Sequence, residues 1–505
     1  SIATAVDRGR GVLLSYGNYA GDVLHFDQAQ ERLRAEGHDV RTVAVTDDIW
    51  SAPPDRIDQR RGIAGDLAVF KAAGAAAEAG YDLDGVERVA RLANARTRSF
   101  GVAFTGCTLP GADAPLFTVP EGRMAVGLGI HGEPGIDEVE VPTADGLAEL
   151  FVTKLLDEVP AGVDLDGARV VPLLNGLGSV KYEELFVVYR AVHRLLEARG
   201  LTVVEPEVGE LCTSFDMAGC SLTLLWLDDE LETLWRAPAD APAYRKGSPT
   251  PQQHVATEAV PEVTDFADAA TSAARHPLPE ATPESRAAAV RIAAAIDAVA
   301  DELDRAADEL GRIDRIAGDG DHGIGMQRGS RAARDAARAA ADAGAGARTT
   351  LEHAGAAWSD RAGGTSGAIW GELLRTLGGV LGDDRPVHAD RVAAGVVAAS
   401  DAVMAYGKAK VGDKTMVDAI VPFADELAAR VGDGGDLVAS WRSATDRAEA
   451  AAQGTAALAA TLGRARSHGD RSIGTPDPGA VSFALVCATV HGVLETTVLE
   501  TSREQ

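Results

Sequence analysis

The chain has 505 residues, which is too long for a single hydrophobic core and predicts two to four domains. Its formal net charge of −28 gives a surface that repels nucleic-acid phosphates, so nucleic acid is excluded as an expected partner. No signal peptide and no long apolar run is evident, so we expect a cytoplasmic protein that has no membrane partner.

Residues 1–236 alternate short apolar runs with helical patterns, which is typical of an α/β fold. Buried strands are expected at 11–14, 40–45, 170–174 and 222–227, and helices at 66–79 and 183–198. We divide this part into two α/β subdomains, residues 1–145 and 146–236. Residues 237–283 are rich in proline and alanine and have little apolar periodicity, which predicts an extended linker.

Residues 284–505 carry apolar side chains at helical spacing, starting with the stripe over 288–303. Further helices are expected around 324–343, 366–382, 388–405, 415–430, 437–462 and 478–498. No strand-like alternation competes with this pattern. The sequence therefore predicts an α/β domain followed by an all-α domain.

Three aspartates fall in one glycine-rich loop at the first helix junction of the all-α domain: Asp314, Asp319 and Asp321. Their spacing does not stack on one helix face, so the chain must turn there. Carboxylates that converge in this way repel one another and favour a bound cation, and oxygen ligands suit Mg²⁺ or Ca²⁺. A solvated loop is the simpler alternative. The G-x-G-x-x-G pattern over 318–323 also matches a dinucleotide fingerprint, but it follows a helix and not a strand.

Three more glycine-bearing loops precede expected helices, at 363–367, 412–416 and 477–479. Backbone N–H groups at a helix start bind phosphate oxygens. Each loop taken alone also fits an ordinary helix cap. Together the four loops indicate a nucleotide site at one end of a helix bundle or barrel.

The motifs GDGDHG, GGTSG, GDKTM and DPGA of this domain resemble the nucleotide-binding (L) domain of dihydroxyacetone kinases. The resemblance implies an eight-helix barrel that binds ATP, with two Mg²⁺ ions held by Asp314, Asp319 and Asp321. It further implies nucleotide contacts at His322, Gly323, Gly325, Thr365, Ser366, Gly407, Met416, Arg464, Asp477 and Gly479.

The first part of the chain resembles the substrate (K) domain of the same family, through the stretches 17–22, 60–65, 129–135, 175–178 and 213–217. The resemblance implies that His131 forms a hemiaminal with the ketone carbon of the substrate and that Asp22 is the general base. On the residues alone, a loop histidine and an aspartate that follows a glycine also fit ordinary loop and cap roles.

Two departures from the family pattern stand out. The K domain of the family begins with a further segment that carries a GGSGHEP loop, so the K domain here is expected to be N-terminally incomplete. The family's usual lysine before the NYxGD stretch is Gly17 in this chain. Its replacement removes a charge and opens volume, which predicts a substrate larger than dihydroxyacetone, such as the four-carbon erythrulose.

The sequence thus predicts a kinase that uses ATP and Mg²⁺ to phosphorylate a terminal hydroxyl of a short-chain ketose held covalently by His131. A flexible linker of this length spans roughly 35–40 Å, which favours a homodimer with domain exchange. One alternative is a lyase that forms cyclic FMN from FAD. Another is a non-catalytic ketose-binding co-regulator.

Overall fold

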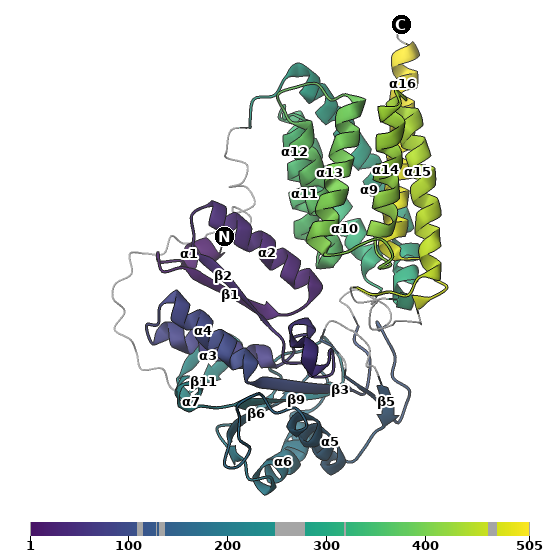
Figure 1. The fold of residues 1–505 in the computed structure, drawn as a ribbon. Coiled ribbons are helices and arrows are strands. Elements are labelled where there is room, and N and C mark those ends of the chain that lie inside the picture. Colours follow the sequence, from purple (N-terminus) through teal and green to yellow (C-terminus); the bar gives the residue numbers. More distant parts are fainter. Residues whose placement is uncertain are drawn as a thin grey trace. The chain divides into compact units, whose positions relative to one another are not determined.

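The computed structural model describes residues 2–108, 115–127, 129–130, 137–247, 278–317, 320–462 and 472–503. The chain divides into two compact units, Ser1–Ala270 and Thr271–Gln505 (Figure 1). The first unit is α/β and the second is helical, as the sequence predicts.

The first unit is built on a mixed sheet in the strand order β5-β4-β3-β9-β6-β7, with β8 also paired to β6. β9 runs antiparallel to both β3 and β6, and every residue of β3 and β9 is buried. The division expected at residue 146 passes through this sheet, because strands from both sides of it hydrogen-bond to one another. The strands are β3 (Thr97–Ala103), β4 (Arg123–Val126), β5 (Asp137–Glu140), β6 (Arg169–Gly176), β7 (Thr202–Val203), β8 (Glu207–Gly209) and β9 (Gly219–Trp226).

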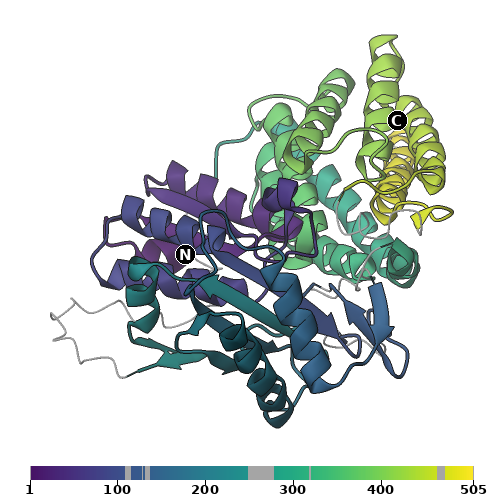
Figure 2. The same cartoon turned by 60° about the horizontal axis from the view of Figure 1, so that its bottom comes forward.

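Helices cover both faces of this sheet (Figures 1 and 2). Side chains of β9 point alternately to the two faces of the sheet, and each face has its own hydrophobic core. Leu222 and Leu224 lie in the core with α5 and α6, whereas Leu225 lies in the core with α3, α4 and α7. The helices are α5 (Ala144–Leu156), α6 (Tyr182–Ala198), α3 (Gly65–Glu78), α4 (Leu83–Ala95) and α7 (Asp229–Arg236).

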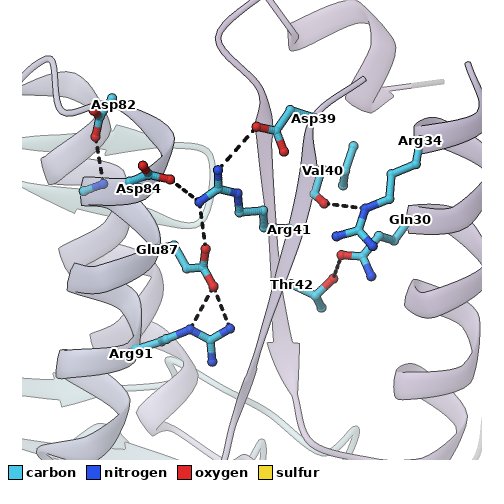
Figure 3. A network of polar contacts seen from close by, with 11 residues as sticks. Gln30, Arg34, Asp39, Val40, Arg41, Thr42, Asp82, Asp84, Glu87 and Arg91 are labelled. Carbon is cyan, nitrogen blue, oxygen red and sulfur yellow. Dashed lines mark hydrogen bonds and ion pairs between the residues drawn. The ribbon is translucent and has the colours of Figure 1, made fainter. Parts of the chain in front are cut away.

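A smaller parallel pair of strands, β1 (Val12–Gly17) and β2 (Val40–Val45), packs on α3 and α4. It is joined by α2 (Ala20–Ala35), and the short α1 (Ile2–Val6) precedes it. Figure 3 shows polar contacts on both sides of β2: Arg41 meets Asp84 and Glu87 of α4, and Arg34 of α2 donates to the Val40 carbonyl at 2.9 Å. These contacts lie at or near the surface, so each contributes little to stability, and they mainly hold the strand in register.

The described residues of the second unit form eight α-helices that close into a ring. Each helix packs against the next in sequence, and the last packs back on the first, which confirms the expected helical barrel. From α9 to α15, short connections between successive helices make neighbours antiparallel. The helices are α9 (Pro283–Ala317), α10 (His322–Asp342), α11 (Ala347–Ala362), α12 (Gly364–Leu381), α13 (Ala389–Gly407), α14 (Val417–Gly432), α15 (Leu437–Gly454) and α16 (Pro478–Arg503).

The predicted linker is wrong over its first residues. Within it, β10 (Ala239–Ala241) and β11 (Tyr244–Lys246) pair as an antiparallel ribbon. The Tyr244 hydroxyl and the Lys246 ammonium both bind Glu207 Oε1, at 2.9 and 3.2 Å. These partners lie far away in the sequence, so local composition does not reveal them. Residues 248–277 of the predicted linker lie outside the described residues.

One helical stretch was not anticipated as an apolar run. By length and composition, Pro478–Thr496 of α16 could cross a membrane. Here it packs against α9, α14 and α15 within the ring, and core helices meet the same criteria. Only 28% of its apolar window is buried, so packing within the ring explains this apolar character in part.

Candidate active site

The starts of α10, α12, α14 and α16 gather at one end of the helical ring. His322 at the start of α10 contacts Ser366 of α12 and Ser482 of α16. The start of α14 lies beside that of α16, because a Cβ on Gly479 would lie 3.4 Å from the Met416 Cβ. Four helix N-termini at one end bring their positive dipole ends together, which suits a polyanion.

His322 is buried and both of its ring nitrogens have partners. Nε2 lies 2.9 Å from the Ser482 hydroxyl and Nδ1 lies 3.2 Å from the Ser366 hydroxyl. Ser482 donates to the Gly479 carbonyl, so its oxygen accepts from Nε2–H and Nδ1 accepts from Ser366. Burial lowers the pKa of His322, which keeps the imidazole neutral. The imidazole of His322 therefore links the helices α10, α12 and α16.

Buried carboxylates lie beside these helix starts. Asp314, near the end of α9, accepts from the His322 backbone N–H at 3.1 Å. Asp477 accepts from the Ala480 N–H at 2.7 Å and so caps α16. Burial is the main cause that raises the pKa of Asp477 to about 7, and the charges of Asp314 and Asp418 contribute to this rise. The carboxylates repel one another, so a cation placed among them would relieve the repulsion.

The loop before α14 is held by side chains that sequence reasoning did not single out. Asp418 accepts from the N–H groups of Gly412 and Thr415, at 2.6 and 2.8 Å. Lys414 is buried and donates to the carbonyls of Leu458 and Ser472. Lys414 therefore supports the loop through main-chain contacts. Its sequence context, a lysine in a glycine-bearing loop, does not distinguish this role from phosphate binding.

Several glycines predicted at the nucleotide site are positions of close packing. A Cβ on Gly323 would come 1.9 Å from the Ala307 carbonyl oxygen, and one on Gly325 would lie 3.3 Å from the Ala362 oxygen. Gly407, at the end of α13, faces Ile369 at 3.3 Å. Gly363 and Gly364 differ: both have positive φ, and a Cβ there would meet nothing. That turn, which leads into Thr365, leaves its backbone accessible to a ligand.

Hydrogen bonds join the predicted substrate motifs of the first unit. The Asn18 amide donates to the Arg60 carbonyl at 2.7 Å, and Arg61 donates to the Gly127 carbonyl at 2.9 Å. The Tyr19 hydroxyl accepts from the Ile130 N–H at 3.2 Å. The loops around residues 18, 61 and 130 therefore meet at the carboxyl ends of the parallel strands β1 and β2, a common place for ligands in α/β folds.

Asp22 lies in the first turn of α2, close to this meeting point. Asp66 lies in the first turn of α3, near Asp22, and sequence reasoning did not single it out. A Cβ on Gly17 would lie 3.0 Å from Asp66 Oδ2. The volume expected to open at Gly17 is thus bordered by a carboxylate. The signal in the sequence was the acidic residue that directly follows the RRGIAG stretch.

The residues present fit a divalent cation through carboxylate oxygens, with Asp314 in the last turn of α9 and Asp321 directly before α10. Among the described residues, no three His, Cys, Asp or Glu side chains gather closely enough to hold a metal ion. Asp319, the third predicted ligand, lies outside the described residues, as do His131 and Arg464.

Comparisons with known proteins cover nearly the whole chain. The Dak1 domain family matches residues 1–243, and the DAK2 domain family matches residues 316–492. An L-erythrulose kinase of Pectobacterium atrosepticum is 58% identical over 100% of this chain and 84% of its own length. A D-erythrulose kinase of Mycolicibacterium smegmatis is 55% identical over 97% of this chain and 83% of its own. The solved dihydroxyacetone kinase of C. freundii in complex with AMP-PNP and Mg²⁺ is 28% identical, with a TM-score of 0.44, over 97% and 82% of the two chains.

Proposed function

The chain belongs to the dihydroxyacetone kinase family, and from that premise we propose that it phosphorylates a terminal hydroxyl of a four-carbon ketose of the erythrulose type. It is a phosphotransferase that acts on short-chain ketoses and uses ATP and Mg²⁺. The observation that carries the proposal is the gathering of four helix starts and buried carboxylates at one end of the ring.

The helical unit holds the phosphoryl donor. Backbone N–H groups at the starts of α10, α12, α14 and α16 bind phosphate oxygens, supported by Thr365 and Ser366. Asp314, Asp319 and Asp321 would hold Mg²⁺, which neutralises charge that develops on the transferred phosphoryl group. His322 positions the helix starts through its two serine contacts.

The α/β unit holds the acceptor. Asp22 accepts the proton of the attacking terminal hydroxyl, and its place in the first turn of α2 stabilises its negative charge. A nitrogen of the His131 imidazole adds to the ketone carbon while the carbonyl oxygen takes up a proton, which fixes the orientation of the substrate. The Tyr19 contact with Ile130 supports this role, because it holds the chain next to His131 close to α2.

The proposal also covers assembly and compartment. We place the enzyme in the cytoplasm, where ATP is supplied, as a homodimer in which the helical unit of one subunit serves the α/β unit of the other. The long proline- and alanine-rich sequence between the two units supports such an exchange.

The test is turnover of the purified full-length chain with ATP and Mg²⁺ as the only donor system. L-erythrulose, D-erythrulose and dihydroxyacetone are supplied separately, and ADP and the sugar phosphate are both measured. We expect at least one erythrulose isomer to be phosphorylated with a higher kcat/KM than dihydroxyacetone. Absence of ketose-dependent ADP release overturns the kinase proposal. Release of cyclic FMN from FAD instead would assign the lyase activity.

A further inference from the structure

A carboxylate oxygen next to the proposed ketose site is buried and has no partner. Asp66 Oδ1 is shut off from solvent, and no hydrogen bond reaches it. A buried acceptor left unpaired is destabilising, so such groups in native proteins call for an explanation. A ligand hydroxyl would satisfy it.

Glycines border this carboxylate on two sides. A Cβ on Gly17 would lie 3.0 Å from Asp66 Oδ2, and one on Gly62 would lie 2.7 Å from Oδ1. The carboxylate therefore lies between the end of β1 and the loop that precedes α3. A side chain at either glycine would press on the carboxylate, so bare backbone packs directly against it on both sides.

The same carboxylate lies among the groups assigned to the substrate. Burial holds the pKa of Asp66 well above its usual range, and the neighbouring charges of Asp47 and Asp22 raise it further. Burial is the main cause that raises the pKa of the Cys212 thiol to about 12, and the charge of Asp66 contributes to this rise. The backbone N–H of Cys212 donates to Asn175, so Asp66 lies near both the α2 start and the Asn175 loop.

Asp47, the nearest other buried carboxylate, differs because both of its oxygens are used. It accepts from the N–H groups of Ile63 and Gly65, at 3.0 and 2.8 Å, and so holds the turn into α3. A structural role explains Asp47 fully. In Asp66, by contrast, Oδ1 accepts no hydrogen bond from the residues that the structure describes, although the first turn of α3 would tolerate a neutral side chain equally well.

The chemistry of the two candidate ketoses differs on one side of the carbonyl. Erythrulose carries adjacent hydroxyls on C3 and C4, whereas dihydroxyacetone ends in a single hydroxymethyl group. The two oxygens of a carboxyl group can each bind one of two adjacent hydroxyls, as in erythrulose. With the single hydroxyl of dihydroxyacetone, one of the two oxygens has no hydroxyl to bind. We propose that Asp66 binds the C3–C4 diol of a four-carbon ketose while Asp22 addresses the hydroxyl at the other end. This inference rests on the proposed function and names its specificity residue.

Asp66→Ala in the full-length chain tests the inference through a selectivity ratio. A site built to bind a hydroxyl loses discrimination when its acceptor is removed, so kcat/KM for erythrulose should fall by about 10–100-fold, mainly through KM. For dihydroxyacetone the change should stay within about threefold. The matched control is Asp55→Asn, an exposed carboxylate whose loss should alter neither substrate.

A deoxy analogue makes the test specific for the diol. 1-Hydroxybutan-2-one has the four-carbon chain but lacks both hydroxyls, and its binding is measured by inhibition. The wild type should bind it more weakly than erythrulose, and this difference should disappear in Asp66→Ala. Equal losses on both ketoses, or an unchanged selectivity ratio, overturn the inference.

Two outcomes are separated by further measurements. If Asp66→Ala does not fold, Asp66→Asn replaces it; its melting temperature should equal or exceed that of the wild type, whereas a structural carboxylate would lower it. If the wild type phosphorylates no ketose, the proposed function fails. Calorimetric binding of erythrulose to wild type and Asp66→Asn then decides the inference by itself, and equal affinities reject it.

Discussion

His322 is the side chain through which three helices of the ring contact one another. Its two ring nitrogens reach Ser366 and Ser482, and its backbone N–H reaches Asp314. A neutral, buried imidazole with both nitrogens satisfied has no capacity left for a further hydrogen bond in its plane. We therefore expect substitution there to act mainly through the position of the helix starts.

His322→Ala should lower the free energy of unfolding by about 2–4 kcal/mol, because it removes the hydrogen bonds to Ser366 and Ser482 and opens a cavity. Hydrogen–deuterium exchange should become faster at the starts of α12 and α16. His353→Ala, an exposed histidine on α11, serves as control and should change neither quantity. Unaltered protection at α12 and α16 in His322→Ala would contradict the bridging role.

Asp477 is one of the buried carboxylates of the candidate site and also caps a helix. Its side chain caps α16, and its pKa is raised to about 7 by burial and by the charges of Asp314 and Asp418. A raised pKa means that, near pH 7, a fraction of the molecules carry a proton on this carboxyl. A cation that binds beside Asp314 favours the ionised form, so binding should expel the proton.

Calorimetry of Mg-ATP binding in buffers of different ionisation enthalpy should therefore show release of about half a proton at pH 7. The affinity should rise as the pH increases through 7, because less work is needed to deprotonate Asp477. Asp477→Asn preserves a capping side chain and should remove this release. The control is Asp436→Asn, an exposed cap at the start of α15. Equal proton release in Asp477→Asn and the wild type would assign the proton to another group.

Elements whose pattern is local were predictable from the sequence. The strand at 40–45 was predicted with the bounds of β2, because it is a short run that contains three valines. β3 was missed, because Arg98 and Ser99 interrupt its apolar run. Ser99 is buried and pairs with Thr223 at 2.6 Å, so the partner that makes burial favourable lies 124 residues away. The β10–β11 ribbon was missed for the same reason.

The candidate site also has features that short stretches of sequence indicate and features that they do not. Asp314, Asp321 and the glycine loops were recognisable, because carboxylate crowding and helix starts are written in short stretches of sequence. The contacts of His322 span 44 and 160 residues, and the unpaired oxygen of Asp66 becomes visible only when Gly17 and Gly62 are brought beside it. Long-range packing determines which polar groups are satisfied, and local patterns do not contain it.

At the scale of the whole molecule, the proposed donor and acceptor groups belong to different units of one chain. Asp22 lies in the α/β unit, and Asp314 lies in the helical unit. Phosphoryl transfer requires the two to meet, either within one chain or between the chains of a dimer. These two arrangements make opposite predictions for mixed subunits.

Asp22→Asn and Asp314→Asn should each reduce kcat by at least about a hundredfold, since one removes the proposed base and the other a proposed cation ligand. Co-expression with two different affinity tags gives a dimer with one variant of each kind. With domain exchange, the intact α/β unit of one subunit meets the intact helical unit of the other, so the mixed dimer should recover about half of the wild-type activity. If each chain serves itself, every pairing contains one defective unit and the mixed dimer stays as inactive as its parents. Recovery that requires both tags on one particle, with no recovery on mixing pre-formed homodimers, identifies exchange within a stable dimer.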